Sequence, residues 1–126
     1  MTDATTPGRQ NVSGGSPYEP VLGYSRAVKV GAQVFVAGTT APGEDAAAQA
    51  RAALATIAGA LEQAGATLSD VVRTRVFLTD IADFDAVGAV HGEVFGDIRP
   101  AMAIVQVVAL AGPDNKVEIE ADAVIA

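Results

Sequence analysis

Carboxylate side chains recur with a spacing of two close to the C-terminus, at Glu118, Glu120 and Asp122. Successive side chains of a β-strand point to opposite faces, so this spacing places all three carboxylates on one face of a strand. A carboxylate in such a row can hold a water molecule or transfer a proton. The row can equally be a solvated face that pairs with Arg73 and Arg75 on a neighbouring strand, and both interpretations stay open.

Few other side chains could carry reactive chemistry. The chain has no cysteine, which excludes disulfides, thiolate catalysis and thiolate metal ligands. It has one histidine, His91, so a conventional zinc site within one subunit is not expected. A single histidine on a helix is more often packed or at the solvent edge than catalytic, although three copies could meet on a trimer axis and bind a metal. We therefore predict no metal site.

Composition and charge exclude several classes of function. The chain has 126 residues, of which 50% are hydrophobic and 18% charged, so we expect one folded domain. The net charge of -7, without a basic run, argues against nucleic acid or an anionic membrane surface as a partner. No apolar run could span a bilayer and no signal-peptide pattern is present, so a cytoplasmic location is expected. Residues 1–8 predict a flexible tail, and residues 9–126 a single domain.

Hydrophobic periodicity predicts the elements that must position these side chains. Helices are expected over residues 44–64, with Gly65 ending the run, and over residues 84–95, with Asp83 as N-cap and Phe84 on the buried side. Strands are expected over residues 24–30, 33–37, 71–78, 101–108 and 116–125, with a further short strand near residues 9–12. Residues 13–23, rich in Gly and Pro, indicate an irregular loop. This order predicts an α+β fold in which a single mixed sheet has both helices packed on one face.

The other face of that sheet is the candidate interface. On the last strand, the apolar residues 117, 119, 121 and 123 are expected to face the helices, opposite the acidic row. On the preceding strand, the small residues at 101 and 103 suit helix packing, which places Met102, Ile104 and Gln106 beside the acidic row. Large apolar residues next to carboxylates favour burial by further copies of the chain, and a symmetric homo-oligomer is the simplest arrangement.

Four segments of the chain resemble the Rid family of reactive-intermediate deaminases, also called the YjgF family. They are Gly31-x-x-Val34-Phe35-Val36-x-Gly38, Val72-Arg73-Thr74-x-Val76-Phe77-Leu78-x-Asp80, Arg99-Pro100-Ala101 and Val117-Glu118-Ile119-Glu120-Ala121. The resemblance covers most of the chain, and it implies a chorismate-mutase-like (RidA-type) α+β subunit, a homotrimer and a ligand cleft at each subunit interface. Active members hydrolyse the enamine or imine of an amino acid, such as 2-iminobutanoate, to a 2-keto acid and ammonia, without a metal or an organic cofactor.

The resemblance also implies roles for individual residues. Glu118 matches the carboxylate beside the substrate or a water molecule, and Tyr24 matches the aromatic hydroxyl at the cleft rim. Active members bind the substrate carboxylate with an arginine two residues after the proline of the Pro-Ala segment, where this chain has Met102. Arg99 lies on the opposite face of an ideal strand from position 102, and it could pair with Asp97, form a salt bridge between subunits or reach an anionic ligand. The cleft positions that are Ser, Asn and Cys in active members are Ala37, Gly88 and Ile104.

Two functional hypotheses follow. The first is a RidA-like enamine/imine deaminase that acts on a small reactive metabolite other than the usual imino acids, because Met102 has no charge with which to hold a carboxylate. In this hypothesis Glu118 orders water and Tyr24 orients the ligand. The second is a non-catalytic homotrimer that binds a small ligand or a partner in the same, more apolar cleft. Ribonuclease activity, a third idea attached to this family, is disfavoured by the net charge of -7.

Overall fold

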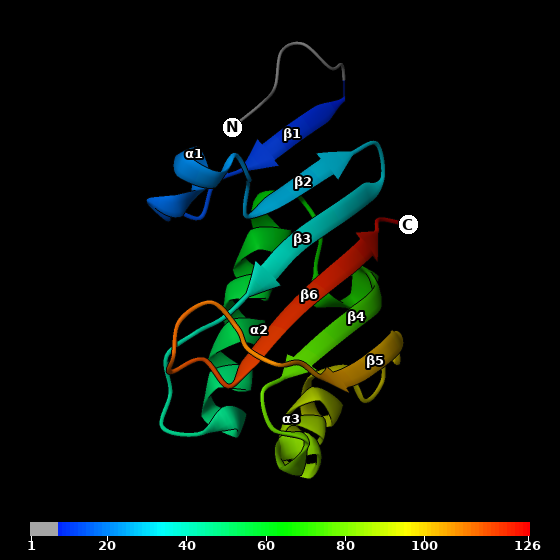
Figure 1. Cartoon of the computed structure of the whole chain (residues 1–126). Helices are drawn as coiled ribbons and strands as arrows, with labels where there is room; N and C mark the ends of the chain where they lie inside the picture. The colour runs from blue at the N-terminus through cyan, green and yellow to red at the C-terminus, as the bar shows by residue number, and fades with distance from the viewer. Residues whose placement is uncertain (1–7) are drawn as a thin grey trace.

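The computed structural model describes residues 8–126, and residues 1–7 of the predicted tail lie outside this part of the chain. Within residues 8–126 the strands form one six-stranded sheet in the order β1-β2-β3-β6-β4-β5. Strands β4 and β5 run parallel, and the other neighbouring pairs run antiparallel. The long helices α2 and α3 lie behind this sheet and leave its other face open (Figure 1). The predicted α+β architecture is therefore confirmed.

The observed elements agree closely with the hydrophobic pattern. The strands are β1 (Arg9–Val12), β2 (Ala27–Val30), β3 (Gln33–Thr39), β4 (Val71–Leu78), β5 (Ala101–Gln106) and β6 (Val117–Val124), and the helices are α1 (Tyr18–Leu22), α2 (Ala46–Gln63) and α3 (Phe84–Phe95). Single 3-10 turns span Leu68–Asp70 and Ile81–Asp83. The bounds of β1, β4 and α3 are those that the sequence predicts. By contrast, β2 begins three residues later than expected and β5 ends two residues earlier.

Helix α2 lies at the centre of the hydrophobic core. The carboxylate of Asp45 accepts a hydrogen bond from the N–H of Ala48 at 2.8 Å and so caps the helix. Gly65 follows the helix with a φ of 83°, a left-handed conformation that favours glycine, as predicted. The buried residues of α2 are Ala46, Gln49, Ala50, Ala53, Leu54, Ile57, Ala60 and Leu61. They pack against the helix-side face of the sheet, mainly on β3 and β6.

Three local predictions are wrong. Residues 18–22 form the short helix α1 instead of an irregular loop, because Pro17 has a helical conformation and starts the helix. Phe84 is 48% exposed, since it occupies the first position of α3, and the buried residues of that helix are Val87, Val90, His91 and Phe95. The side chain of Asp83 makes no capping hydrogen bond, whereas Asp80 accepts one from the N–H of Ala82 in the preceding turn.

The prediction for the two faces of β5 is also wrong. Met102 pairs with Thr74 and Ile104 pairs with Val76, and both partners are buried on the helix side of the sheet. Paired residues on neighbouring strands share a face, so Met102, Ile104 and Gln106 lie on the helix side. Ala101, Ala103 and Val105 lie on the open face. Residue size is misleading here because β5 is the edge strand, where even the helix-side residues stay partly exposed.

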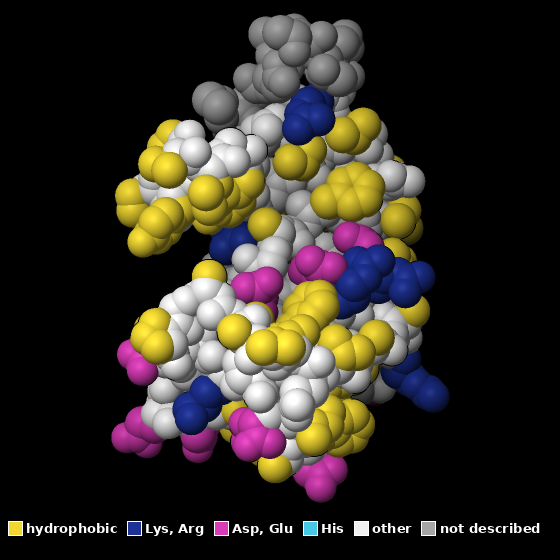
Figure 2. Space-filling model, viewed as in Figure 1, with side chains coloured by type: hydrophobic (Ala, Val, Ile, Leu, Met, Phe, Trp, Pro, Cys, Tyr) yellow, Lys and Arg dark blue, Asp and Glu magenta, His cyan; other side chains and the backbone are white. Residues whose placement is uncertain are grey.

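The open face carries apolar and charged side chains together. Figure 2 shows this face, with hydrophobic side chains around a group of acidic and basic ones and a hollow below α1. Three large apolar residues, Phe35, Val105 and Val124, are exposed on this face. Their cross-strand pairing with the acidic row or with its neighbours places them there. Within residues 8–126, no helix has the length and hydropathy needed to cross a bilayer.

Candidate functional site

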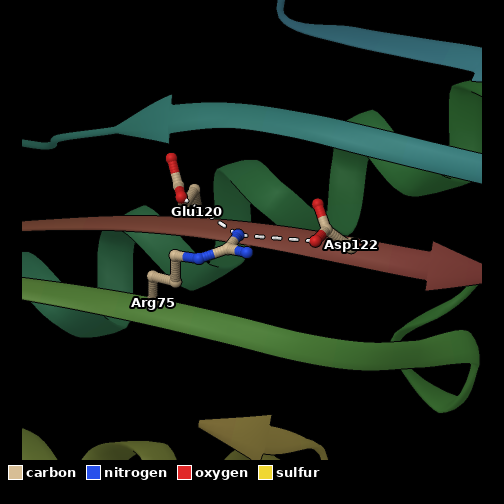
Figure 3. A network of polar contacts seen from close by, with 3 residues as sticks. All are labelled: Arg75, Glu120 and Asp122. Carbon is tan, nitrogen blue, oxygen red and sulfur yellow. Dashed lines mark hydrogen bonds and ion pairs between the residues drawn. The ribbon is translucent and has the colours of Figure 1, made fainter. Parts of the chain in front are cut away.

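The acidic row of β6 lies on the open face, where the spacing of two predicts it. Arg75 on β4 pairs with two members of the row, because its Nη1 lies 3.2 Å from Glu120 Oε1 and 3.4 Å from Asp122 Oδ2 (Figure 3). The prediction that an arginine of β4 partners the row is thus confirmed for Arg75. Arg73 forms no ion pair with any residue in the range 8–126, so its predicted role as a second partner is wrong.

Glu118 differs from its two neighbours in the row. It forms no hydrogen bond or ion pair with the residues that the structure describes, and its side chain is only partly buried. The carboxylate rests against Gly38 of β3, so closely that a Cβ built on Gly38 would lie 2.5 Å from Oε2. Only a glycine allows this contact. Glu118 is therefore a carboxylate in close contact with the β3 bulge that remains available to water or a ligand.

A β-bulge in β3 produces the contact between Gly38 and Glu118. Val36 pairs with Ala121 and Thr39 pairs with Ile119, so two residues of β3, Ala37 and Gly38, lie opposite one residue of β6. An extra residue of this kind bends the strand and redirects its neighbours, and bulges are common beside functional sites. The bulge contains Ala37, a predicted site residue, and places it next to the acidic row.

Tyr24 lies on the same side of the sheet as Ala37. It follows α1, is 37% exposed, and lines a cavity of about 430 Å³ with Ala37, Phe35, Glu120 and further residues of β1 and β2. The structure therefore brings together Tyr24 and Ala37, two of the seven predicted site residues, in one cavity. Glu118 does not line this cavity, but it lies on the same face of the sheet and contacts Gly38, the residue after Ala37.

The other four predicted site residues lie elsewhere in the subunit. Met102 and Ile104 are on the helix side of edge strand β5, and Gly88 is on the surface of α3, where an added Cβ would meet no atom within 4 Å. Arg99 is exposed in the turn between α3 and β5, with a φ of 55°, a conformation that is uncommon for residues other than glycine. Strand β4 lies between β5 and the strand of Glu118, and Met102 and Ile104 are on the opposite face of the sheet from Glu118. One subunit alone does not assemble the seven residues.

His91 belongs to the hydrophobic core. Its Nε2 lies 2.8 Å from the hydroxyl of Thr74, which is itself buried, and its ring contacts Phe95 with 4.6 Å between the centroids. Burial lowers the pKa of His91 below its ordinary value. This packed position agrees with the more frequent of the two roles considered for a single helical histidine. No group of three or more potential metal ligands occurs within residues 8–126.

Sequence reasoning missed two polar residues that hold the surroundings of the site. Gln49 is buried on α2, donates to the carbonyls of Gly43 and Asp114 at 3.2 and 2.9 Å, and accepts from the N–H of Lys116 at 2.8 Å. These bonds connect the two loops that line a cavity of about 840 Å³, to which none of the seven predicted site residues contributes. The one sign of Gln49 in the sequence is that a polar residue stands on the apolar side of a predicted helix. The second missed residue, Arg26, donates a hydrogen bond to the β3 bulge, and the sequence gives no sign of this role.

Comparisons with known proteins identify related chains over nearly the full length. Residues 15–125 match the family described as Endoribonuclease L-PSP. A crystal structure of a YjgF/YER057c/UK114 family member from Mycobacterium tuberculosis is 56% identical, covers 93% of this chain and 99% of its own, and superposes with a TM-score of 0.91. The 3-aminoacrylate deaminase RutC of Acinetobacter baylyi is 40% identical over 79% of this chain and 85% of its own. A 2-iminobutanoate/2-iminopropanoate deaminase of Salmonella typhimurium is 37% identical over 80% of this chain and 86% of its own.

Proposed function

Because the chain belongs to the Endoribonuclease L-PSP family, the YjgF or Rid proteins, we propose that it is an enamine/imine deaminase that needs no cofactor. Its substrate would be a small reactive metabolite, and its products a carbonyl compound and ammonia. Two relatives that are 37–40% identical carry deaminase names, which supports this reaction class.

The free carboxylate of Glu118 is the observation that carries the proposal. In the same row, Glu120 and Asp122 form ion pairs with Arg75, whereas Glu118 has no polar partner among residues 8–126 and lies against Gly38. A carboxylate without a cation beside it is suited to hold a water molecule and to accept its proton.

The proposed reaction requires only modest acid–base chemistry. An enamine first becomes the imine, as its carbon gains a proton and its nitrogen loses one. Glu118 then accepts a proton from water as the water oxygen bonds to the imine carbon, and it returns this proton to the nitrogen to give a neutral carbinolamine. The hydroxyl proton of this adduct then passes through Glu118 to the nitrogen as the carbon–nitrogen bond breaks, so that ammonia leaves and the carbonyl compound remains. One carboxylate that first accepts and then donates a proton is sufficient for this sequence. The Tyr24 hydroxyl, at the rim of the neighbouring cavity, would orient the ligand.

The proposed substrate has no carboxylate of its own. Methionine at position 102 provides neither a charge nor a hydrogen-bond donor, and Ala37, Gly88 and Ile104 likewise provide no polar side chain. A cleft with this lining would favour a neutral, partly apolar imine over an imino acid, because a desolvated carboxylate needs a cation as its partner.

We further propose that the complete cleft forms between two copies of the chain in a homotrimer. Tyr24, Ala37 and Glu118 lie on one side of the subunit and Met102 with Ile104 on the other, so a neighbouring copy is needed to unite them. Exposed apolar residues on the open face, Phe35 among them, provide the surface that such an assembly would bury. In sedimentation experiments, we expect the wild-type protein to be a trimer and the Phe35→Asp variant to be a monomer. A wild-type protein that sediments as a monomer would contradict the proposed assembly.

A matched pair of variants tests the proposed role of Glu118. A flavin amine oxidase can release a neutral imine from a primary amine, and the protein is expected to accelerate release of the carbonyl product. Glu118→Gln should reduce this acceleration by about 100-fold or more. Glu120→Gln, which removes a carboxylate of the same row, should keep most of the acceleration of product release. Equal losses in the two variants would contradict a specific role for Glu118.

A non-catalytic binding function is the second candidate, and the apolar residues at the predicted cleft positions favour it. In that case no imine would be turned over by the folded protein. Small neutral ligands would bind instead, and substitution of Met102 or Ile104 would weaken their affinity, as measured by calorimetry.

A further inference from the structure

Arg26 connects the N-terminal part of the chain to the bulge in β3. It lies just before β2, and its Nη2 donates a hydrogen bond of 2.6 Å to the carbonyl of Gly38. Its own backbone carbonyl accepts a hydrogen bond from the N–H of Ala37 at 2.9 Å. Both residues of the bulge, Ala37 and Gly38, are therefore hydrogen-bonded to the same arginine.

The loop that precedes α1 holds the Arg26 side chain in place. A Cβ built on Gly14 would lie 3.1 Å from Arg26 Cδ, so this loop rests directly on the arginine stem. The loop is fixed in turn by Glu19 of α1, whose Oε2 accepts hydrogen bonds from the N–H groups of Gly14 at 2.9 Å and Ser16 at 3.2 Å. Burial would raise the pKa of Glu19, but these bonds outweigh it and hold the pKa below its ordinary value.

The guanidinium of Arg26 is held between the β3 bulge and the loop before α1. Its Nε is buried and has no hydrogen-bond acceptor within residues 8–126. A buried N–H without a partner is unfavourable, so the Nε group does not itself favour this position. The hydrogen bond to Gly38, the contact with the loop before α1 and the electrostatic attraction of Glu19 favour it instead. Arg26 also pairs with no carboxylate within 4.0 Å in the described chain, although Glu19 lines the same cavity of about 210 Å³.

We propose that Arg26 is a positioning residue for Glu118. Through its hydrogen bond to the Gly38 carbonyl, it fixes the backbone surface on which the Glu118 carboxylate rests, and it does not touch the substrate. This inference rests on the proposed function, because Glu118 is the group that would hold the reacting water. It predicts that loss of the guanidinium misplaces the carboxylate while the sheet itself remains folded.

The first test does not depend on enzyme activity. Arg26→Met keeps the apolar stem but removes the donors, Arg26→Lys keeps the charge, and Arg51→Met is a matched control that removes a surface ion pair with Glu93 on the helix layer. In carbon-13 NMR spectra, the Gly38 carbonyl and the Glu118 carboxyl resonances are expected to shift in Arg26→Met, to shift less in Arg26→Lys, and to stay unchanged in Arg51→Met. Unchanged resonances in both Arg26 variants would overturn the inference. If Arg26→Met does not fold, Arg26→Lys provides the comparison.

The second test separates positioning from substrate binding by arginine. Arg26→Met should lower kcat about tenfold and change KM by less than about twofold, and it should cause no further loss in the Glu118→Gln background. A higher KM with an equal loss in both backgrounds would overturn the inference, because it would show Arg26 contacting the substrate. Shifted resonances in a protein that deaminates no imine would support the positioning role and contradict the proposed function instead.

Discussion

Replacement of Gly38 by alanine is the most informative single change that the structure suggests. The new Cβ would lie 2.5 Å from Glu118 Oε2 and 3.0 Å from its Cδ, whereas ordinary van der Waals contact begins at 3.4 Å. The backbone φ of Gly38 is not in the left-handed region, so alanine is compatible with the chain at this position. The far end of the Glu118 side chain must therefore move away by about 1 Å.

This displacement should affect activity far more than stability. A carboxylate side chain can rotate at little cost, and a glycine-to-alanine change at an allowed backbone conformation restricts the unfolded chain, so the free energy of unfolding should change by less than about 1 kcal/mol. A misplacement of about 1 Å at a reacting group can reduce the rate by about 100-fold, which corresponds to about 2.7 kcal/mol in the activation free energy. We therefore expect Gly38→Ala to be folded and nearly inactive.

The assay combines kcat/KM for a neutral imine with urea denaturation of the same samples. Gly59→Ala is the matched control, because Gly59 lies on α2 and an added Cβ there meets no atom within 4 Å. This control should keep its activity and become slightly more stable, since alanine is favoured in helices. A Gly38→Ala protein with wild-type kcat/KM would refute the conclusion that the seating of Glu118 on Gly38 matters for the reaction.

Three further predictions concern other parts of the molecule. Burial holds the pKa of His91 below its ordinary value of 6.5, so the unfolded chain binds a proton more readily and stability should fall as the pH drops below about 6.5. His91→Gln should remove this part of the pH dependence of the unfolding free energy, as measured by urea denaturation at several pH values. An equal pH dependence in the two proteins would contradict the prediction. Met102→Arg is expected to raise turnover of 2-iminobutanoate by about tenfold or more, because it adds a cation at that position, and no gain in keto-acid release would contradict the role of position 102. Gln49→Leu should cost about 2–4 kcal/mol of unfolding free energy, because three loop groups lose their partner, and a loss below about 1 kcal/mol would argue against this bridging role.

The sequence predicted those features that depend on local periodicity. The spacing of two in β6 was sufficient to place the acidic row opposite Val117 and Ile119, because alternation is a property of any strand. The bounds of β4 and α3 followed in the same way from their apolar residues. Sequence alone could not decide which face of β5 meets the helices, since alternation defines two sets but not their orientation. That choice depends on the parallel register with β4, which is a long-range property.

The details of the candidate site depend on contacts between distant segments. Nothing local to β6 distinguishes Glu118 from Glu120, because the difference arises from Arg75 on one side and from the bulge at Gly38 on the other. The same holds for Arg26, which lies in an ordinary strand-like run and becomes significant only when β2 and β3 pair. Sequence patterns therefore identified the carboxylates, and the fold distinguishes the free one from those that are paired.

A comparison of two imines tests whether the cleft rejects a substrate that carries a carboxylate. 2-Iminobutanoate, generated in place by a threonine dehydratase, carries a carboxylate, and the imine released by an amine oxidase from a primary amine carries none. With semicarbazide as the competing trap, we expect faster release of the carbonyl product from the neutral imine and no acceleration with 2-iminobutanoate. Acceleration with 2-iminobutanoate alone would contradict the proposed substrate class, because it would show that the cleft binds a carboxylate without a cation at position 102.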